Sequence, residues 1–198
     1  MELIIATANP HKIKEFEQII PPHITLLSAL EAGVTQEVEE NEVTLEGNAL
    51  LKARFIHKQT QKACFADDTG LFVEHLDGQP GIFSARFAQK EGIISDNPSQ
   101  DNITLLLQKL SGETNRKAYF RTVIALIDQN SQEYLFEGII HGEITICHSG
   151  MKGFGYDPVF VPDGYNQTFA ELSSIEKNAI SHRGRATAKL IDYLKTTK

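Results

Sequence analysis

Glycines, an aromatic side chain, an acid and cations gather near the end of the chain, a combination that suits nucleotide binding. The run Gly153 to Pro158 reads Gly-Phe-Gly-Tyr-Asp-Pro, and Glu176-Lys177-Asn178 and Ser181-His182-Arg183-Gly184 follow it. Glycine lets the backbone approach a ligand, an aromatic ring can stack on a base, and the cations can donate to phosphate or carbonyl oxygens. The alternative is a glycine-rich turn followed by a solvated helix start.

A second group of polar side chains lies at the first predicted strand-to-helix turn. Thr7, Asn9 and Lys12 stand where the amides at a helix N-terminus attract an anion, and Lys12 adds a full positive charge. The pattern is not that of a Walker A loop, and Gly153-Phe154-Gly155 lacks the third glycine of a dinucleotide-binding fingerprint. The turn therefore predicts an anion site, with a plain strand-turn-helix joint as the alternative.

Two adjacent carboxylates follow a short apolar run. Asp67 and Asp68 precede Thr69-Gly70, which predicts a turn between strands at 63–66 and 71–76. Adjacent carboxylates repel each other, so a positive group should offset them, and hard oxygen ligands at a phosphate site favour Mg²⁺ or Mn²⁺. The alternative is an Asx turn that caps the strand end.

A further set of acids can add a ligand to the same metal. Its members are Glu37, Glu39, Glu40 and Glu42, and a solvated loop is the alternative. No Ser/His/Asp or Cys/His nucleophile pattern stands out in the sequence. The remaining mechanism is direct attack of water on phosphorus, in which a metal stabilises charge, cations balance the polyphosphate and a carboxylate orients or deprotonates the water.

Hydrophobic periodicity predicts the elements that must position these groups. Helices are expected over about 44–60, 97–110 and 182–194, and a further helix carries Ile13, Phe16 and Ile20 on one face. Strands are expected at 2–7, 24–27, 119–128, 132–140 and 143–148, with a hairpin at 129–131. Because the last three strands are antiparallel, the sheet should be mixed. No linker or repeat divides the chain, which indicates one α/β domain over residues 1–198.

Composition excludes several classes of protein. The 198 residues are 41% hydrophobic, enough for a core without a disulfide or metal scaffold. A net charge of -7 argues against a protein whose main role is to coat nucleic acid. Glu2 stands where a signal peptide carries positive charge, and no long apolar run suggests a membrane span. Cys64 and Cys147 lie in apolar runs without metal-ligand spacing, so we expect reduced core thiols and a cytoplasmic location.

Six ordered motifs resemble the inosine triphosphate pyrophosphatase-like family, nearly from end to end. They are Thr7-Ala8-Asn9-Pro10-His11-Lys12, Asn48-Ala49 with Lys52-Ala53, Ala66 to Leu71, Pro80-Gly81 with Ser84-Ala85-Arg86, Gly153 to Pro158, and Glu171-Leu172 through Glu176-Lys177-Asn178 to Ser181-His182-Arg183. The resemblance implies Mg²⁺-dependent hydrolysis of ITP, dITP and XTP, which are noncanonical purine nucleotides, to monophosphate and pyrophosphate. It further implies one Mg²⁺ per subunit of a homodimer, and an elongated mixed sheet flanked by helices, with two lobes around a central cleft.

The resemblance also implies residue roles. Asp68 would accept the proton and bind the metal with Glu40, while Asp67 would support them. The implied substrate-binding residues are Thr7, Ala8, Asn9, Pro10, His11 and Lys12 at the phosphates, Thr69, and Phe154, Gly155, Tyr156, Asp157, Lys177, His182 and Arg183 around the base and sugar.

Two departures from the family pattern bear on function. Thr69 replaces a serine but keeps the hydroxyl, and Gly47 replaces a glutamate, which leaves both Glu39 and Glu40 open as the second metal ligand. The alternatives are a relative of the same fold that hydrolyses pyrimidine or methylated nucleotides, and a non-catalytic nucleotide-binding or nucleic-acid-binding module.

Overall fold

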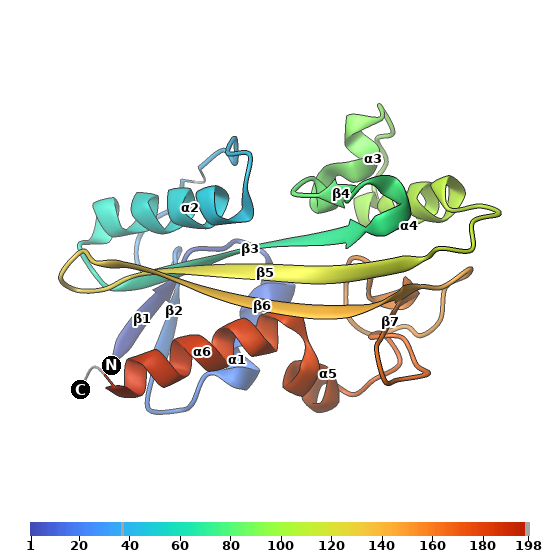
Figure 1. Cartoon of the computed structure of the whole chain (residues 1–198). Coiled ribbons are helices and arrows are strands. Elements are labelled where there is room, and N and C mark those ends of the chain that lie inside the picture. Colours follow the sequence, from blue (N-terminus) through green and yellow to red (C-terminus); the bar gives the residue numbers. More distant parts are fainter. Residues whose placement is uncertain (37, 197–198) are drawn as a thin grey trace. The chain divides into compact units, whose positions relative to one another are not determined.

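The computed structural model describes residues 1–36 and 38–196 of the chain. Glu37 of the acidic run and the last two residues of the predicted 1–198 domain lie outside the described residues. The rest forms a mixed β-sheet with helices packed on it (Figure 1), which confirms the predicted α/β class.

The sheet joins strands that lie far apart in the sequence. Its strands are β1 (Glu2–Ile5), β2 (Thr25–Ser28), β3 (Cys64–Val73), β4 (Pro80–Gly81), β5 (Lys117–Ile127), β6 (Glu133–Ile144) and β7 (Phe160–Pro162). The hydrogen-bonded order is β2-β1-β3-β5-β6-β7, with β4 paired to β3. β1 is parallel to β2 and β3, whereas β4 is antiparallel to β3 and β7 is antiparallel to β6. The predicted mixed sheet is therefore confirmed.

The predicted helices form close to their expected bounds. The helices are α1 (Pro10–Ile19), α2 (Leu45–Thr60), α3 (Phe87–Lys90), α4 (Pro98–Lys109), α5 (Ser174–Ile180) and α6 (His182–Thr196), with 3-10 turns at Glu74–Leu76, Ser84–Arg86 and Asp157–Val159. Asn9 and Asn97 are the N-caps of α1 and α4, and each precedes a proline at the first helical position. An asparagine side chain satisfies amides that the helix leaves unbonded, and proline loses no hydrogen bond there.

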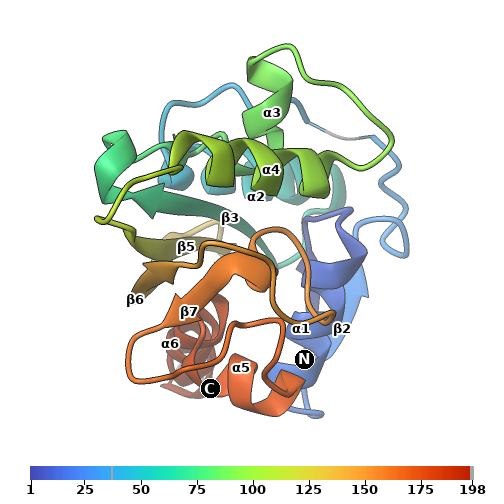
Figure 2. The same cartoon turned by 90° about the vertical axis from the view of Figure 1, so that its right-hand side faces the viewer.

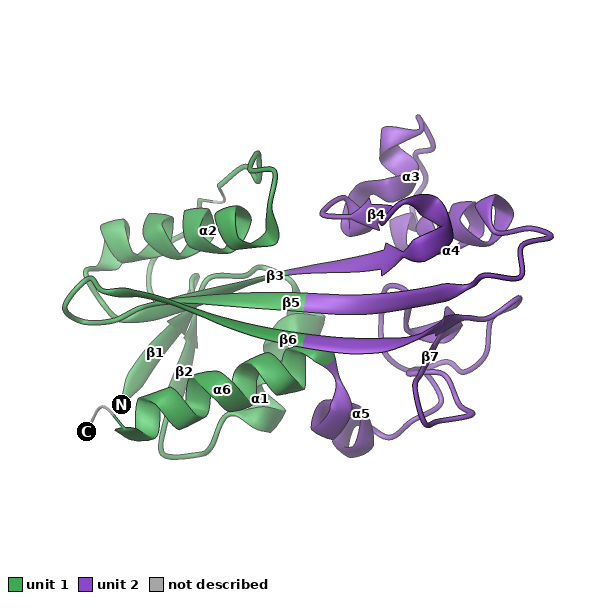
Figure 3. Ribbon diagram, viewed as in Figure 1, with its two compact units in different colours: residues 1–68, 122–138, 182–198 green, residues 69–121, 139–181 purple. Residues whose placement is uncertain are grey.

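The chain divides into two compact units, which Figure 3 distinguishes by colour. Unit 1 comprises Met1–Asp68, Thr122–Gly138 and His182–Lys198, and unit 2 comprises Thr69–Arg121 and Ile139–Ser181. In unit 1, α2 covers one face of the sheet while α1 and α6 cover the other (Figure 1). In unit 2, α3 and α4 lie on one side of β3 and β5, and α5 lies on the other (Figure 2).

Each unit has its own apolar core, which fixes the strands that carry polar groups. In unit 1, Phe16 of α1 packs edge-on against Phe65 of β3, with ring centroids 5.0 Å apart. In unit 2, Phe120 of β5 packs edge-on against Phe160 of β7, with ring centroids 4.7 Å apart. Close packing around buried rings gives the neighbouring side chains little freedom to shift.

The predicted turn at Asp67 to Gly70 is wrong, because β3 runs without interruption from Cys64 to Val73. Its N-terminal part pairs with β1 and its C-terminal part pairs with β4. Gly70 serves this pairing, since a Cβ there would lie 2.6 Å from the carbonyl oxygen of Gly81. Glycine therefore permits close approach of β4 and does not end the strand.

Two further expectations need correction. The predicted strand at 143–148 is wrong beyond Ile144, because β6 continues to that residue and the antiparallel neighbour is β7 instead. Cys64 is buried as expected, whereas Cys147 is exposed. Among the described residues, no helix has the length and apolar character needed to cross a membrane.

Candidate active site

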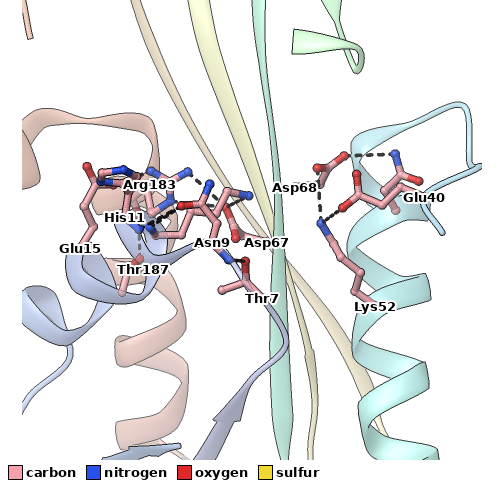
Figure 4. A network of polar contacts seen from close by, with 12 residues as sticks. Thr7, Asn9, His11, Glu15, Glu40, Lys52, Asp67, Asp68, Arg183 and Thr187 are labelled. Atoms are coloured by element: carbon pink, nitrogen blue, oxygen red, sulfur yellow. Dashed lines mark hydrogen bonds and ion pairs between the residues drawn. The ribbon is translucent and has the colours of Figure 1, made fainter. Parts of the chain in front are cut away.

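The turn between β1 and α1 is organised by side chains of its own sequence (Figure 4). The Asn9 Oδ1 atom accepts hydrogen bonds from the amides of His11 and Lys12 at 3.0 and 3.3 Å. The Thr7 hydroxyl oxygen accepts from the Asn9 amide at 3.2 Å. Asn9 thus already uses two amides of the helix start, so the attraction for an anion at this turn comes mainly from Lys12.

Asp67 lies at the centre of a buried charge network in unit 1. Its Oδ2 atom lies 2.9 Å from Lys12 Nζ and 3.3 Å from both Nε and Nη2 of Arg183. Arg183 also donates through Nη1 to Glu15 of α1. Asp67 is fully buried and Arg183 is 2% exposed, so the charges in this network must balance one another.

This balance determines the charge state of each group. Burial disfavours an ionised Asp67, but Lys12 and Arg183 outweigh burial and hold the pKa of Asp67 well below its usual range. Burial also opposes the charge on Arg183, yet Asp67 and Glu15 raise its pKa. For Lys12, burial prevails and lowers the pKa. Asp67 therefore remains an anion that holds two cations beside the turn.

Asp68 lies in a second group of unit 1, on the other side of β3 (Figure 4). Successive side chains of a strand point to opposite faces, so neighbours in sequence meet different partners. Asn48 Nδ2 donates to Asp68 Oδ2 at 3.2 Å, and Lys52 Nζ lies 3.5 Å from Asp68 Oδ1. The same ammonium lies 2.6 Å from Glu40 Oε1. The expected repulsion between the paired acids is thus relieved by separation as well as by cations.

The Asp68 environment suits proton transfer. Burial raises the pKa of the Asp68 carboxyl and outweighs the opposing charge of Lys52. Burial also opposes the charge of Lys52, but the surrounding carboxylates, Asp68 foremost, outweigh it and raise the pKa of the ammonium. A carboxylate with a raised pKa is a stronger base at neutral pH than an exposed aspartate.

The donor set around Lys52 fits a hard divalent cation. Glu40 and Asp68 already share one positive group, and both offer the carboxylate oxygens that Mg²⁺ prefers. Among the described members of the acidic run, Glu40 is the one that shares a cation with Asp68. Within the described part of the chain, no three His, Cys, Asp or Glu side chains cluster as a complete metal site. Mg²⁺ commonly binds through one or two carboxylates plus phosphate and water.

Unit 2 holds a separate group built around Asp157. The Asp157 Oδ2 atom accepts from the Phe154 amide at 2.8 Å and from Lys177 Nζ at 2.6 Å. Lys177 Nζ also lies 5.1 Å from the centroid of the Phe154 ring. Gly153 has a φ of +75°, and a Cβ there would lie 2.1 Å from Asp157 Oδ2. The glycine therefore makes room for the carboxylate that holds this loop.

The other predicted site residues lie in several elements and loops. The Tyr156 hydroxyl donates to the Ser84 carbonyl at 2.9 Å, and burial raises its pKa. Ser173 and Glu176 form a capping box at the start of α5, as the Ser-x-x-Glu spacing allows. His182 is buried at the start of α6, Thr69 is half-buried in β3, and Gly155 has a φ of +58°. Ala8, Pro10 and His11 are exposed. The substrate-contact roles of all these residues stay predictions.

Three charged or polar residues join the two groups of unit 1 although the sequence prediction gave them no role. They are Glu15, Asn48 and Lys52. Asn48 and Lys52 are four residues apart, a spacing that places both on one face of α2. Glu15 follows Lys12 by three residues on α1. Asn48 and Lys52 belong to one of the six family motifs, which was the signal that could have indicated them, whereas Glu15 belongs to none of these motifs.

The α/β sheet has a central strand with two buried carboxylates, where Lys12 and Arg183 pair with Asp67 and Lys52 pairs with Asp68; such charged groups are of the kind that enzymes use to bind anionic ligands. Residues 3–193 match the Ham1 family, and the chain belongs to that family. It is 47% identical over 195 residues to the dITP/XTP pyrophosphatase of Flavobacterium psychrophilum, covering 98% of this chain and 100% of the relative. It is 46% identical to that of Porphyromonas gingivalis, covering 100% and 99%.

Solved structures agree with this assignment. The Staphylococcus aureus Ham1 protein superimposes with a TM-score of 0.88 at 37% identity and 100% coverage of both chains. The nucleoside-triphosphatase / dITP/XTP pyrophosphatase of Mycobacterium abscessus gives a TM-score of 0.74 at 40% identity, covering 96% of this chain and 99% of that one. The predicted resemblance to the inosine triphosphate pyrophosphatase-like family is confirmed.

Proposed function

We propose that the protein hydrolyses ITP, dITP and XTP to the nucleoside monophosphate and pyrophosphate. The observation that carries this proposal is identity of 43–47% to relatives named dITP/XTP pyrophosphatase, over nearly the whole of each chain. The buried Asp68, with its raised pKa and its neighbours Glu40 and Lys52, supports the same reaction. The biological role would be to clear deaminated purines from the nucleotide pool.

Asp68 is the proposed proton acceptor. Water attacks the α-phosphorus, a phosphorus–oxygen bond forms, the bond to the pyrophosphate leaving group breaks, and the proton of the water moves to the Asp68 carboxylate. Lys12 offers positive charge for the polyphosphate, and Asp67, which bonds to both cations, keeps Arg183 beside Lys12. Mg²⁺, held by Glu40 and Asp68, would supply the stabilisation of negative charge that develops on the phosphate oxygens.

The proposal also covers the base. Deaminated purines carry a carbonyl acceptor at position 6, where adenine carries an amino donor, so protein donors at this edge favour inosine and xanthine. Donors left unbonded by adenine cost about 1–3 kcal/mol each, roughly tenfold or more in specificity. Lys177 is the proposed donor in unit 2, and the Phe154 ring, whose centroid lies 5.1 Å from Lys177 Nζ, supports the assignment of an aromatic surface to the base.

A homodimer, one Mg²⁺ per subunit and a cytoplasmic location complete the proposal. They derive from the family resemblance and, for location, from the cysteine pattern of the sequence. Size-exclusion chromatography with light scattering measures the oligomeric state, and the homodimer predicts a mass near twice 22.0 kDa.

A substrate panel tests the proposed reaction. Purified protein is incubated with Mg²⁺ and ITP, dITP, XTP, ATP, GTP or dTTP, and the products are separated by ion exchange. We expect monophosphate and pyrophosphate from the first three, with ATP and GTP nearly unchanged. Orthophosphate with diphosphate, or preferential loss of dTTP, would contradict the proposal and favour another nucleotide.

A further inference from the structure

The side chain of Asn48 connects the loop that carries Glu40 and Glu42 to the proposed catalytic carboxylate of Asp68. Asn48 lies in the first turns of α2 and is 1% exposed. Its Oδ1 atom accepts from the amide of Glu42 at 3.1 Å, and its Nδ2 atom donates to Asp68 Oδ2 at 3.2 Å. One rigid amide group therefore links the backbone of the loop to the side chain of Asp68.

A second contact holds the loop against the same turn of α2. A Cβ on Gly47 would lie 2.8 Å from the Glu42 Cβ atom, so glycine lets Glu42 pack directly on the helix. The Thr44 hydroxyl accepts from the Gly47 amide at 3.0 Å and fixes the helix start. The loop backbone is thus held at Glu42, two residues from Glu40, whose carboxylate reaches Lys52 at 2.6 Å.

We infer that Asn48 is a positioning residue that sets the separation of the Glu40 and Asp68 carboxylates and thereby the affinity for a divalent cation. This inference rests on the proposed metal role of those two residues. Each carboxylate comes from a different element, Glu40 from a loop and Asp68 from β3. Metal affinity depends on how well the ligands are held before the metal binds, and a loop ligand needs an anchor.

The amide group is the chemistry that this position requires. It offers a donor to the carboxylate and an acceptor to the loop amide at the same time, and no other short side chain does so from two different atoms. An aspartate would turn acceptor atoms toward Asp68 in a buried place, and an alanine would leave the Glu42 amide and Asp68 Oδ2 without these bonds. Loss of groups that orient metal ligands typically weakens metal binding by about 10–100-fold.

Titration of the full-length protein with Mn²⁺ alone, followed by electron paramagnetic resonance, tests the inference without relying on turnover. Asn48→Ala, Glu40→Gln and the double variant form a thermodynamic cycle. Asn102→Ala is the matched control, because Asn102 is also buried and bonds through both ends of its amide, to Ala88 and to Ser84 and Ala85. It reports the general cost of losing a buried asparagine.

We expect Asn48→Ala to weaken Mn²⁺ binding at least tenfold, and Asn102→Ala to leave it within twofold of the parent. In the Glu40→Gln background, Asn48→Ala should weaken Mn²⁺ binding clearly less, because the carboxylate ligand that Asn48 positions is gone. Equal losses in both backgrounds, or equal weakening by Asn102→Ala, would overturn the positioning role while leaving the proposed function intact. Unchanged Mn²⁺ binding by Glu40→Gln would overturn the metal assignment and this inference with it.

Discussion

Replacing Asp67 by asparagine removes the anion from the most buried charge network of unit 1. Lys12 Nζ and two nitrogens of Arg183 all bond to one oxygen of Asp67, which is fully buried. In the variant, Arg183 keeps Glu15, but Lys12 loses its carboxylate at 2.9 Å. A buried cation then lacks compensation, which costs far more than the loss of a surface ion pair.

The free energy of unfolding should fall by about 3–5 kcal/mol at neutral pH, the range measured when one partner of a buried ion pair is removed. For a domain of this size, that corresponds to a fall in Tm of roughly 6–20 °C. Asp67 is the leading group that opposes the lowering of the Lys12 pKa by burial, so the variant should lower that pKa further. Because the pKa of Lys12 is then lower in the folded than in the unfolded protein, the unfolded state binds more protons, and stability rises with pH. The difference in unfolding free energy between the variant and the parent should therefore shrink from pH 7 to pH 9.

Urea unfolding at pH 7 and pH 9 measures both effects. The double variant Lys12→Met with Asp67→Asn should recover at least half of the loss, because it removes the uncompensated charge. Asp192→Asn, a substitution at an exposed carboxylate paired with Lys195, is the control and should change stability by less than about 0.5 kcal/mol. A loss below about 1 kcal/mol for Asp67→Asn, or no recovery in the double variant, would refute the reasoning.

Three further substitutions test other parts of the site. Asp68→Asn should abolish turnover of ITP while unfolding stays cooperative, because the amide cannot accept the proton; turnover near that of the parent would remove Asp68 as the essential base. Lys12→Ala should raise KM for ITP more than it lowers kcat, and should lower Tm because its ammonium also pairs with Asp67; unchanged kinetics would place Lys12 outside the site. Gly153→Ala should lower Tm more than Gly164→Ala, because both have positive φ but only Gly153 would place a Cβ against Asp157; equal falls in Tm would contradict the role of Asp157 in holding the loop.

Local sequence signals located the helix starts well. Asn9 and Asn97 before prolines, and Ser173 with Glu176, mark helix starts because each cap acts within three residues of itself. The turn predicted at Asp67 to Gly70, between strands at 63–66 and 71–76, was wrong for a related reason. Asp-Asp-Thr-Gly is typical of a turn, and only partners distant in sequence keep those carboxylates inside a strand.

The residues that hold each carboxylate were decided by the tertiary structure. Arg183 reaches Asp67 across 116 residues of sequence, and Asn48 reaches Asp68 across 20. Neither separation matches a periodicity of helix or strand, so no local pattern encodes the contact.

The sequence by itself therefore determined the residue types of the site, the main helices and the mixed character of the sheet. It also determined the family, through motifs whose order and spacing are specific. Only the tertiary structure placed Asp67 and Asp68 on opposite sides of one strand, with Lys12 and Arg183 at the first and Lys52 at the second. The physical reason is that propensity and capping act over a few residues, whereas burial and charge pairing depend on which distant segments the core brings together.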